Sequence, residues 1–169
     1  MPALLTVPKP NDFTPTEDYE IRAKRHKDKV ARIYRERITL YRACQANVQL
    51  QALVLAKCKR DPIYFINYFV TTYDPRIEPS LIPFVLFERQ EECIKWIIER
   101  IERKEWGIIV KCRDTGLSWL FCAVYGWYLL FHPNSKLTLA SNKAVNVDKK
   151  NDEDCLFEKL VMLIRFLPS

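Results

Sequence analysis

The chain has 169 residues, a net charge of +6 and an apolar content of 49%, with 4 Trp, 8 Tyr and 9 Phe. This length and apolar content support one domain with a buried core and do not fit a largely disordered protein. Only three glycines stand against ten prolines, which is typical of helices joined by proline-bounded turns rather than of an all-β sandwich or barrel. The positive charge is compatible with a polyanionic partner but does not identify one.

Cysteine spacing and the N-terminal sequence bear on the compartment. The six cysteines have no Cys-x-x-Cys pair and no nearby histidine, which favours free thiols in a reducing compartment over a zinc site. Residues 1–10 lack the apolar core of a secretory leader. The apolar run 117–131 spans about 15 residues, whereas a membrane helix needs about 20. These features predict a cytoplasmic protein.

The first third of the chain is expected to hold a flexible arm followed by a basic helical region. Residues 1–16 contain several prolines and few periodic apolar residues, so we expect a flexible N-terminal arm there. Residues 17–60 are expected to be helical, in two pieces, because apolar side chains recur from Val30 to Tyr41 at helical spacing. Asp61-Pro62 ends this region, since a residue before proline disfavours helical geometry.

The remaining residues predict alternating helices and strands. The expected elements are a helix within 63–73, a proline-rich loop at 74–83, an amphipathic helix at 88–104, a strand at 106–112 buried on both faces, an apolar helix at 118–131, a second strand at 136–141, a short helix or turn at 142–150, and a last helix at 154–166. A strand, a crossover helix and a second strand predict a parallel pair. The expected fold class is therefore α/β, with a three-layer core of parallel strands and flanking helices.

The turn before the apolar helix has the parts of a phosphate-binding loop, which are a strand, a tight turn and a helix N-terminus. Gly116 can adopt a positive φ, and the Ser118 hydroxyl is placed to cap the helix and to ligate Mg²⁺. The standard pattern G-x-x-x-x-G-K-[S/T] is matched only at Gly116 and Ser118. Lys111 stands where the pattern has its first glycine, and Leu117 stands where it has its lysine. A cation from Lys111, with Arg113 in support, is expected to fold toward the phosphates. The alternative is an ordinary strand–turn–helix with surface charges.

The run from Lys111 to Trp119, Lys-Cys-Arg-Asp-Thr-Gly-Leu-Ser-Trp, resembles the deviant Walker A loop of terminase large subunits, in which the lysine is displaced to the front of the loop. Other segments resemble the same family in order. They are 61–67 with 72–76 before the ATPase core, 84–90 as the adenine motif, 139–143 with 147–148 as the next strand and turn, and 156–168 as the following helix. The resemblance implies that residues 61–169 are the N-terminal portion of an incomplete P-loop ATPase domain.

The resemblance also implies an activity and a set of site residues. Terminase large subunits are ATP-driven motors that package double-stranded viral DNA into capsids in the host-cell cytoplasm, so a phage or prophage origin and ATP with Mg²⁺ are expected. The implied phosphate-binding residues are Lys111, Arg113, Asp114, Thr115, Gly116, Leu117 and Ser118, with Ser118 also holding Mg²⁺. Gln90 would contact adenine through its amide; the alternative is a solvated residue in the first turn of a helix. The portal and the small terminase subunit are implied partners, and oligomerisation is expected of a full-length protein.

The parts needed for hydrolysis are not found in the sequence. A P-loop ATPase also needs a strand that ends in acidic residues, and the only acidic cluster after Gly116 is Asp152-Glu153-Asp154. No strand precedes this cluster, and we expect it to cap the following helix. The family's nuclease domain is also missing. The sequence thus predicts a truncated terminase that lacks turnover of its own and leaves an apolar face or strand edge exposed.

A second reading concerns the basic region. Its cations are Arg22, Lys24, Arg25, Lys27, Lys29, Arg32, Arg35, Arg37 and Arg42. They are placed to contact DNA phosphates without sequence specificity, or an acidic protein surface. The alternative is a solvated helix face. A different class of function follows, namely a catalytically silent DNA- or protein-binding module left by gene truncation.

Overall fold

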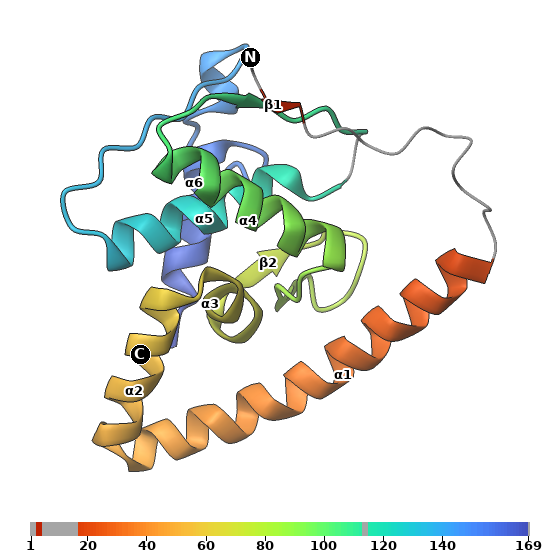
Figure 1. Cartoon of the computed structure of the whole chain (residues 1–169), viewed down its shortest axis with the longest axis vertical. Helices are drawn as coiled ribbons and strands as arrows, with labels where there is room; N and C mark the ends of the chain where they lie inside the picture. Colours follow the sequence, from red (N-terminus) through yellow and green to blue (C-terminus); the bar gives the residue numbers. More distant parts are fainter. Residues whose placement is uncertain (1–2, 5–16, 113–114, 169) are drawn as a thin grey trace.

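A computed structural model describes residues 3–4, 17–112 and 115–168. The described part is mostly helical. Its helices are α1 (Glu17–Ala46), α2 (Val48–Arg60), α3 (Pro62–Phe69), α4 (Glu88–Glu102), α5 (Leu117–Phe131) and α6 (Leu156–Arg165), with a 3₁₀ turn η2 (Ala144–Asn146). Figure 1 shows α1 as a long helix along one side of the molecule, with α2 returning the chain to the cluster formed by the other helices.

Short polar side chains set the boundaries of the first three helices. The Asn47 side chain accepts the Leu50 N–H at 3.0 Å and begins α2. Asp61 ends α2, and its carboxylate accepts the Tyr64 N–H at 2.9 Å at the start of α3, where Pro62 occupies the first helical position. Both arrangements are N-caps that satisfy otherwise unpaired backbone donors. The predicted two-piece helix and its break at Asp61-Pro62 are confirmed.

A hairpin that the sequence did not predict follows α3. Strand β2 (Thr71–Tyr73) pairs antiparallel with β3 (Leu81–Pro83), with Thr72 opposite Ile82. The Phe84 N–H donates to the Val70 carbonyl at 2.9 Å and extends this pairing by one more hydrogen bond. Residues 71–73 are therefore not helical, and the expected loop at 74–83 contains a strand, because the two segments satisfy each other's backbone groups.

The two strands predicted for the central sheet differ from expectation. Strand β4 (Gly107–Ile108) is two residues long and pairs in parallel with β1 (Ala3–Leu4). Residues 136–141 form no strand in the described structure. The predicted burial of 106–112 on both faces is wrong, because Ile108 is 50% exposed and Val110 63% exposed, while Ile109 packs against the core. The described residues show no three-layer parallel sheet, and that finer architecture stays a prediction.

The core is built around α5. Leu120, Cys122 and Val124 are fully buried in this helix and contact buried residues of α3 and α4, including Ile66 and Ile94. A helix that is apolar on all sides is stable only when it is enclosed, and α3, α4 and α6 pack around α5. Among the described residues, no helix has both the length and the apolarity that a membrane crossing requires.

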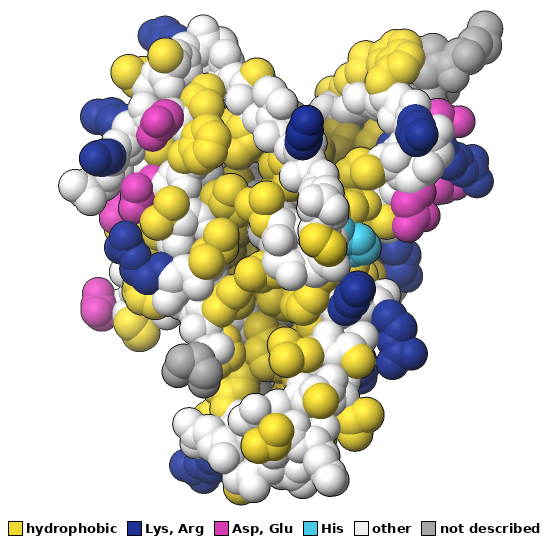
Figure 2. Space-filling model, turned by 90° about the vertical axis from the view of Figure 1, so that its left-hand side faces the viewer, with side chains coloured by type: hydrophobic (Ala, Val, Ile, Leu, Met, Phe, Trp, Pro, Cys, Tyr) yellow, Lys and Arg dark blue, Asp and Glu magenta, His cyan; other side chains and the backbone are white. Residues whose placement is uncertain are grey.

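Hydrophobic side chains also remain at the surface. Trp106, the residue before β4, is 64% exposed. Figure 2 shows apolar side chains gathered over the middle of one face, with Lys and Arg mostly at its edges.

Polar contacts hold α1 against the rest of the molecule. Ile33 and Arg37 are buried on its inner face, and the Arg37 guanidinium donates to the Val70 carbonyl at 3.1 Å and to the Tyr41 hydroxyl. The Tyr41 hydroxyl in turn donates to the Tyr68 carbonyl at 2.7 Å. The predicted contact of Arg37 with a partner is therefore wrong, because its side chain is buried and forms hydrogen bonds inside the protein.

A buried hydrogen bond between α5 and α2 gives a stability prediction. The Trp127 indole N–H donates to the Cys58 carbonyl at 2.8 Å. Trp127→Phe removes this donor and leaves the carbonyl unpaired, which we expect to lower the free energy of unfolding by about 1–3 kcal/mol in chemical denaturation. Trp106→Phe, at an exposed site, is the control and is expected to change it by less than about 0.5 kcal/mol. Equal effects of the two changes would contradict this account.

Candidate functional site

The predicted phosphate loop ends at a glycine in the left-handed region. Gly116 has φ +70° and ψ 12° and is the residue before α5, not part of the helix. A Cβ atom at this position would lie 3.2 Å from the Gln90 Nε2 atom. A larger residue would therefore meet both backbone strain and a close side chain. Both constraints explain why glycine occupies the turn.

Gln90 connects this loop to α4. Its Nε2 atom donates to the Thr115 carbonyl at 3.1 Å, and its Oε1 atom accepts the Phe87 N–H at 3.0 Å. Gln90 is partly buried rather than solvated. An amide has two N–H donors and two acceptor lone pairs, so each end of the Gln90 side chain retains capacity for another partner, such as a purine edge.

A cavity of about 570 Å³ brings the predicted residues together. Its lining includes Gln90, Lys111, Thr115, Gly116, Leu117 and Ser118. This volume lies within the roughly 300–1,000 Å³ of small-molecule sites. The predicted ligands Arg113 and Asp114 lie outside the described residues. Lys111 at the front of the loop and Gly116 at its end thus line the same cavity as Gln90. Gln90 precedes both of them by more than twenty residues in the sequence.

Ser118 has a narrower role than predicted. The N-cap residue of α5 is Gly116, and no side chain among the described residues caps this helix. The capping role assigned to Ser118 is therefore wrong, because Ser118 lies one residue inside the helix. Its side chain is exposed and lines the cavity, so it remains available to a ligand.

Four charged residues that the sequence did not assign to a nucleotide site line the same cavity, which are Asp74, Arg76, Asp154 and Lys159. Asp74 accepts two hydrogen bonds of 2.8 Å from the Arg76 guanidinium, and this neighbour lowers the pKa of Asp74 to about 2. The Asp-Pro-Arg turn was visible in the sequence. Lys159 had no such signal, because a lysine in an amphipathic helix is expected on the solvated face.

The acidic cluster at 152–154 does not cap α6. The N-cap residue of that helix is Cys155, whose sulfur accepts the Glu158 N–H at 3.4 Å. Asp152 forms an ion pair with Lys149 at 2.9 Å. The capping prediction is wrong because the helix begins after the cluster. Across the described part of the chain, no three His, Cys, Asp or Glu side chains gather as a metal site.

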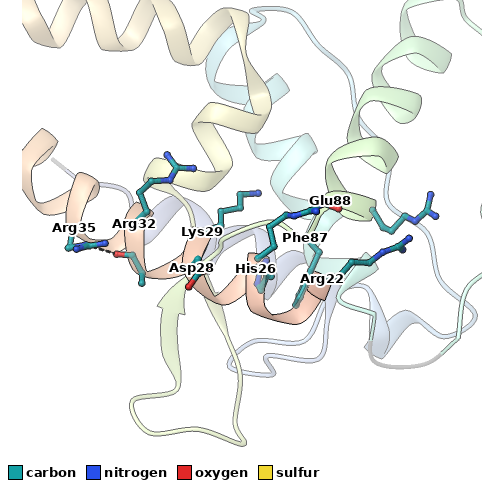
Figure 3. A pocket seen from close by; sticks show the side chains of 11 residues that line it. Arg22, His26, Asp28, Lys29, Arg32, Arg35, Phe87 and Glu88 are labelled. Carbon is teal, nitrogen blue, oxygen red and sulfur yellow. Dashed lines mark hydrogen bonds and ion pairs between the residues drawn. The ribbon is translucent and has the colours of Figure 1, made fainter. Parts of the chain in front are cut away.

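A second hollow, of about 740 Å³, lies between α1 and the start of α4. We call it the basic groove, and it is lined by Arg22, Arg25, His26, Asp28, Lys29, Ala31, Arg32, Arg35, Phe87, Glu88 and Arg89. Figure 3 shows Arg35 toward one end and Arg22 toward the other, with His26 and Phe87 between them. The two ring centroids are 3.6 Å apart at an interplanar angle of 18°. Lys24 and Lys27 are exposed but do not line the groove.

Carboxylates balance part of the charge in the basic groove. Arg25 pairs with Glu88 at 2.9 Å, and Lys29 pairs with Glu91 at 2.5 Å while donating to the Leu86 carbonyl at 2.6 Å. The Lys29 ammonium is therefore used in holding α1 to α4. The remaining cations give the groove its positive character, with Arg32 exposed even in its pair with Glu36.

Comparison of the chain with protein-family models, with curated proteins and with solved structures gave no match. The geometry described above is thus the basis for assigning a function.

The His26–Phe87 stack predicts a pH dependence. Burial lowers the pKa of His26 below 6.5, and the Lys29 charge lowers it further, against an opposing effect of Glu91. A histidine with a lowered folded-state pKa destabilises the fold when it is protonated, so this loss appears as pH falls below about 6.5. His26→Phe keeps a ring and removes the titration. We expect the free energy of unfolding of His26→Phe minus that of wild type to grow as pH falls from about 7.5 to about 5.5. A constant difference across this range would contradict the assignment.

Proposed function

We propose that this chain is the nucleotide-binding part of an ATP-driven motor of the terminase large-subunit class, of phage or prophage origin, which packages double-stranded DNA into capsids. The observation that supports it best is the cavity in which the left-handed Gly116, the forward-placed Lys111 and the adenine-motif residue Gln90 meet. In that family, Lys111 and Gly116 correspond to the phosphate loop and Gln90 to the adenine motif. Their common cavity supports reading them as one site.

The residues of the cavity suit a nucleoside triphosphate. The Lys111 ammonium would neutralise phosphate charge, and the N-terminus of the 15-residue helix α5 offers backbone N–H donors to an anion. Gln90 would hydrogen-bond the adenine edge. Ser118 would hold Mg²⁺, which neutralises phosphate charge when it is bound. Arg113 and Asp114 complete the proposed loop.

A three-layer ATPase core is part of this proposal. Its two central strands would be 106–112 and 136–141, on the same side of α5. Support comes from a smaller cavity of about 330 Å³, where Lys111 and Thr138 lie together with Leu139. The Tyr125 hydroxyl of α5 also donates to the Thr138 carbonyl at 3.3 Å. Both segments therefore face one cavity beside α5, which is compatible with the proposed pairing.

The proposed activity of this chain is binding rather than hydrolysis. Among the described residues, two carboxylates line the cavity, Asp74 and Asp154. Asp74 is held by the Arg76 guanidinium, and Asp154 lies in the turn before α6 rather than at the end of a strand. Neither is placed as the strand-borne acid that orients water in P-loop ATPases.

Titration with a fluorescent ATP analogue and Mg²⁺ tests the site. We expect Lys111→Ala to weaken binding about tenfold or more, because a charge-assisted hydrogen bond is lost, and Ser118→Ala to weaken it several-fold. Lys95→Ala, on the exposed side of α4, is the control and should bind as wild type does. Equal affinity of Lys111→Ala, Ser118→Ala and wild type would remove the phosphate-site assignment.

The basic groove favours a second candidate function. Five of its lining residues are Arg and one is Lys, against Asp28 and Glu88. Such a surface suits a catalytically silent module that holds the phosphate backbone of double-stranded DNA without reading bases. An acidic surface of a protein such as a portal or a small terminase subunit is the other occupant to test.

Salt dependence tests this second function. We expect Arg32→Gln/Arg35→Gln to reduce the slope of log affinity for duplex DNA against log salt by about 2, since each lost phosphate contact changes it by about 0.9. Lys24→Gln/Lys27→Gln removes the same charge from α1 outside the groove and serves as the control. Equal slopes for the two double variants would remove the groove as the DNA site. No binding at low salt would leave an acidic protein as its partner.

A further inference from the structure

A buried lysine from α6 lies in the cavity of the proposed nucleotide site. Lys159 is 6% exposed and is one of three buried polar or charged residues, with Arg37 and Asn67, in the described part of the chain. It lines the same cavity as Lys111, Gly116 and Ser118. A buried ammonium is costly unless it is paired, so its position calls for an explanation.

The neighbours of Lys159 satisfy its ammonium only in part. One N–H donates to the Glu153 carbonyl, and the ammonium lies 5.6 Å from the centre of the Trp119 ring. No salt bridge joins Lys159 to a carboxylate among the residues with described positions. An ammonium has three donors, so this set of contacts leaves capacity for an anion.

The surrounding charges do not offset the burial. The pKa of Lys159 is lowered from 10.5, chiefly by burial, although Asp154 and Asp152 act to raise it. Removal from water thus outweighs the nearby carboxylates. A phosphate in the cavity would add the missing counter-charge, since charge-assisted hydrogen bonds are strong in such surroundings.

Trp119 links Lys159 to the phosphate loop. Trp119 follows Ser118 in the first turn of α5, so the ring that faces the ammonium stands next to the proposed Mg²⁺ ligand. Behind it, α6 packs against α5, where Leu160 is buried near Gly126. The packing of these two helices places Lys159 at the cavity.

We propose that Lys159 is a second phosphate ligand, supplied by α6, which contacts a bound nucleoside triphosphate together with Lys111 on the loop. This inference rests on the proposed nucleotide site and adds to it a residue outside the loop. In the ligand-free protein the Glu153 carbonyl and the Trp119 ring hold the ammonium. Nucleotide binding then joins α6 to the start of α5 through the phosphates.

The test compares two substitutions by titration with the fluorescent ATP analogue and Mg²⁺. Lys159→Met keeps the length and apolar character of the side chain but removes its charge, and we expect it to weaken binding about tenfold or more. Lys159→Arg keeps a cation and is expected to bind within about threefold of wild type. A side chain needed only for packing would give the opposite order, because methionine suits a buried site better than arginine does.

Competition with ADP, AMP and inorganic tripolyphosphate identifies the group that Lys159 contacts. We expect Lys159→Met to reduce the preference for ATP over AMP and to weaken tripolyphosphate binding in parallel. If Lys159→Met binds every competitor as wild type does while Lys111→Ala does not, the inference about Lys159 is overturned and the nucleotide site stands. If wild type binds none of these ligands, the proposed function itself fails.

A second measurement covers the case in which Lys159→Met does not fold. Selective ¹³C labelling of lysine side chains in wild type allows the Lys159 Cε signal to be assigned by its loss in Lys159→Arg. We expect this signal to shift on addition of ATP with Mg²⁺ and not on addition of AMP. A signal that is unmoved by saturating ATP would overturn the inference.

Discussion

The Gln90 side chain is the contact on which the candidate site depends. One amide group joins the first turn of α4 to the residue before Gly116, through bonds of 3.0 and 3.1 Å. Lys111, Thr115 and Ser118 are exposed, whereas Leu117 is partly buried and packs against the core. A glycine in the left-handed region lets the backbone approach the amide closely. The described part of the loop is therefore connected to the core by the Gln90 side chain together with the packing of Leu117.

The two ends of the molecule are organised differently. Around α5 the interior is apolar and closely packed, with Ile66, Leu86 and Ile94 fully buried. Along α1 the inner face is held by Arg37 and Lys29, which donate to backbone carbonyls of the core. Hydrogen bonds to charged donors contribute modestly to net stability but are costly to leave unmade. The long helix is thus fixed in register by polar contacts, while its outer face remains solvated and basic.

The spacing of apolar residues and the positions of helix-breaking residues were sufficient to locate the helices. The isoleucine stripe of α4, the Asp61-Pro62 break and the apolar run of α5 each carry a local signal, and each element begins and ends within a few residues of its prediction. Gly116 was likewise identified from the turn chemistry that its position demands. Local physics acts within a turn or two of the chain, so these features can be read from neighbouring residues alone.

Features that depend on distant contacts were not predictable in this way. Thr71–Tyr73 continues an aromatic helix in sequence, and only its pairing with Leu81–Pro83 makes it a strand. Lys159 and Arg37 look like solvated residues of amphipathic helices, yet both are buried because of what packs against them. Ile108 and Val110 show the converse, as β-branched residues that lack a covering layer in the described structure. Arg37 contacts Val70 and Lys159 contacts Trp119, both far along the chain, whereas Thr72 pairs with Ile82 only ten residues later.

Phe87 stands at a junction between the two candidate sites. Its ring stacks on His26 in the basic groove, and its backbone N–H donates to the Gln90 amide oxygen, while the same amide reaches the predicted phosphate loop. If two ligands each displaced Phe87, the free energy of that one movement would contribute to the binding of both. Thermodynamic reciprocity then requires the factor by which a polyanion changes nucleotide affinity to equal the factor by which nucleotide changes polyanion affinity. Coupling through Phe87 would therefore act equally in both directions between α1 and the loop.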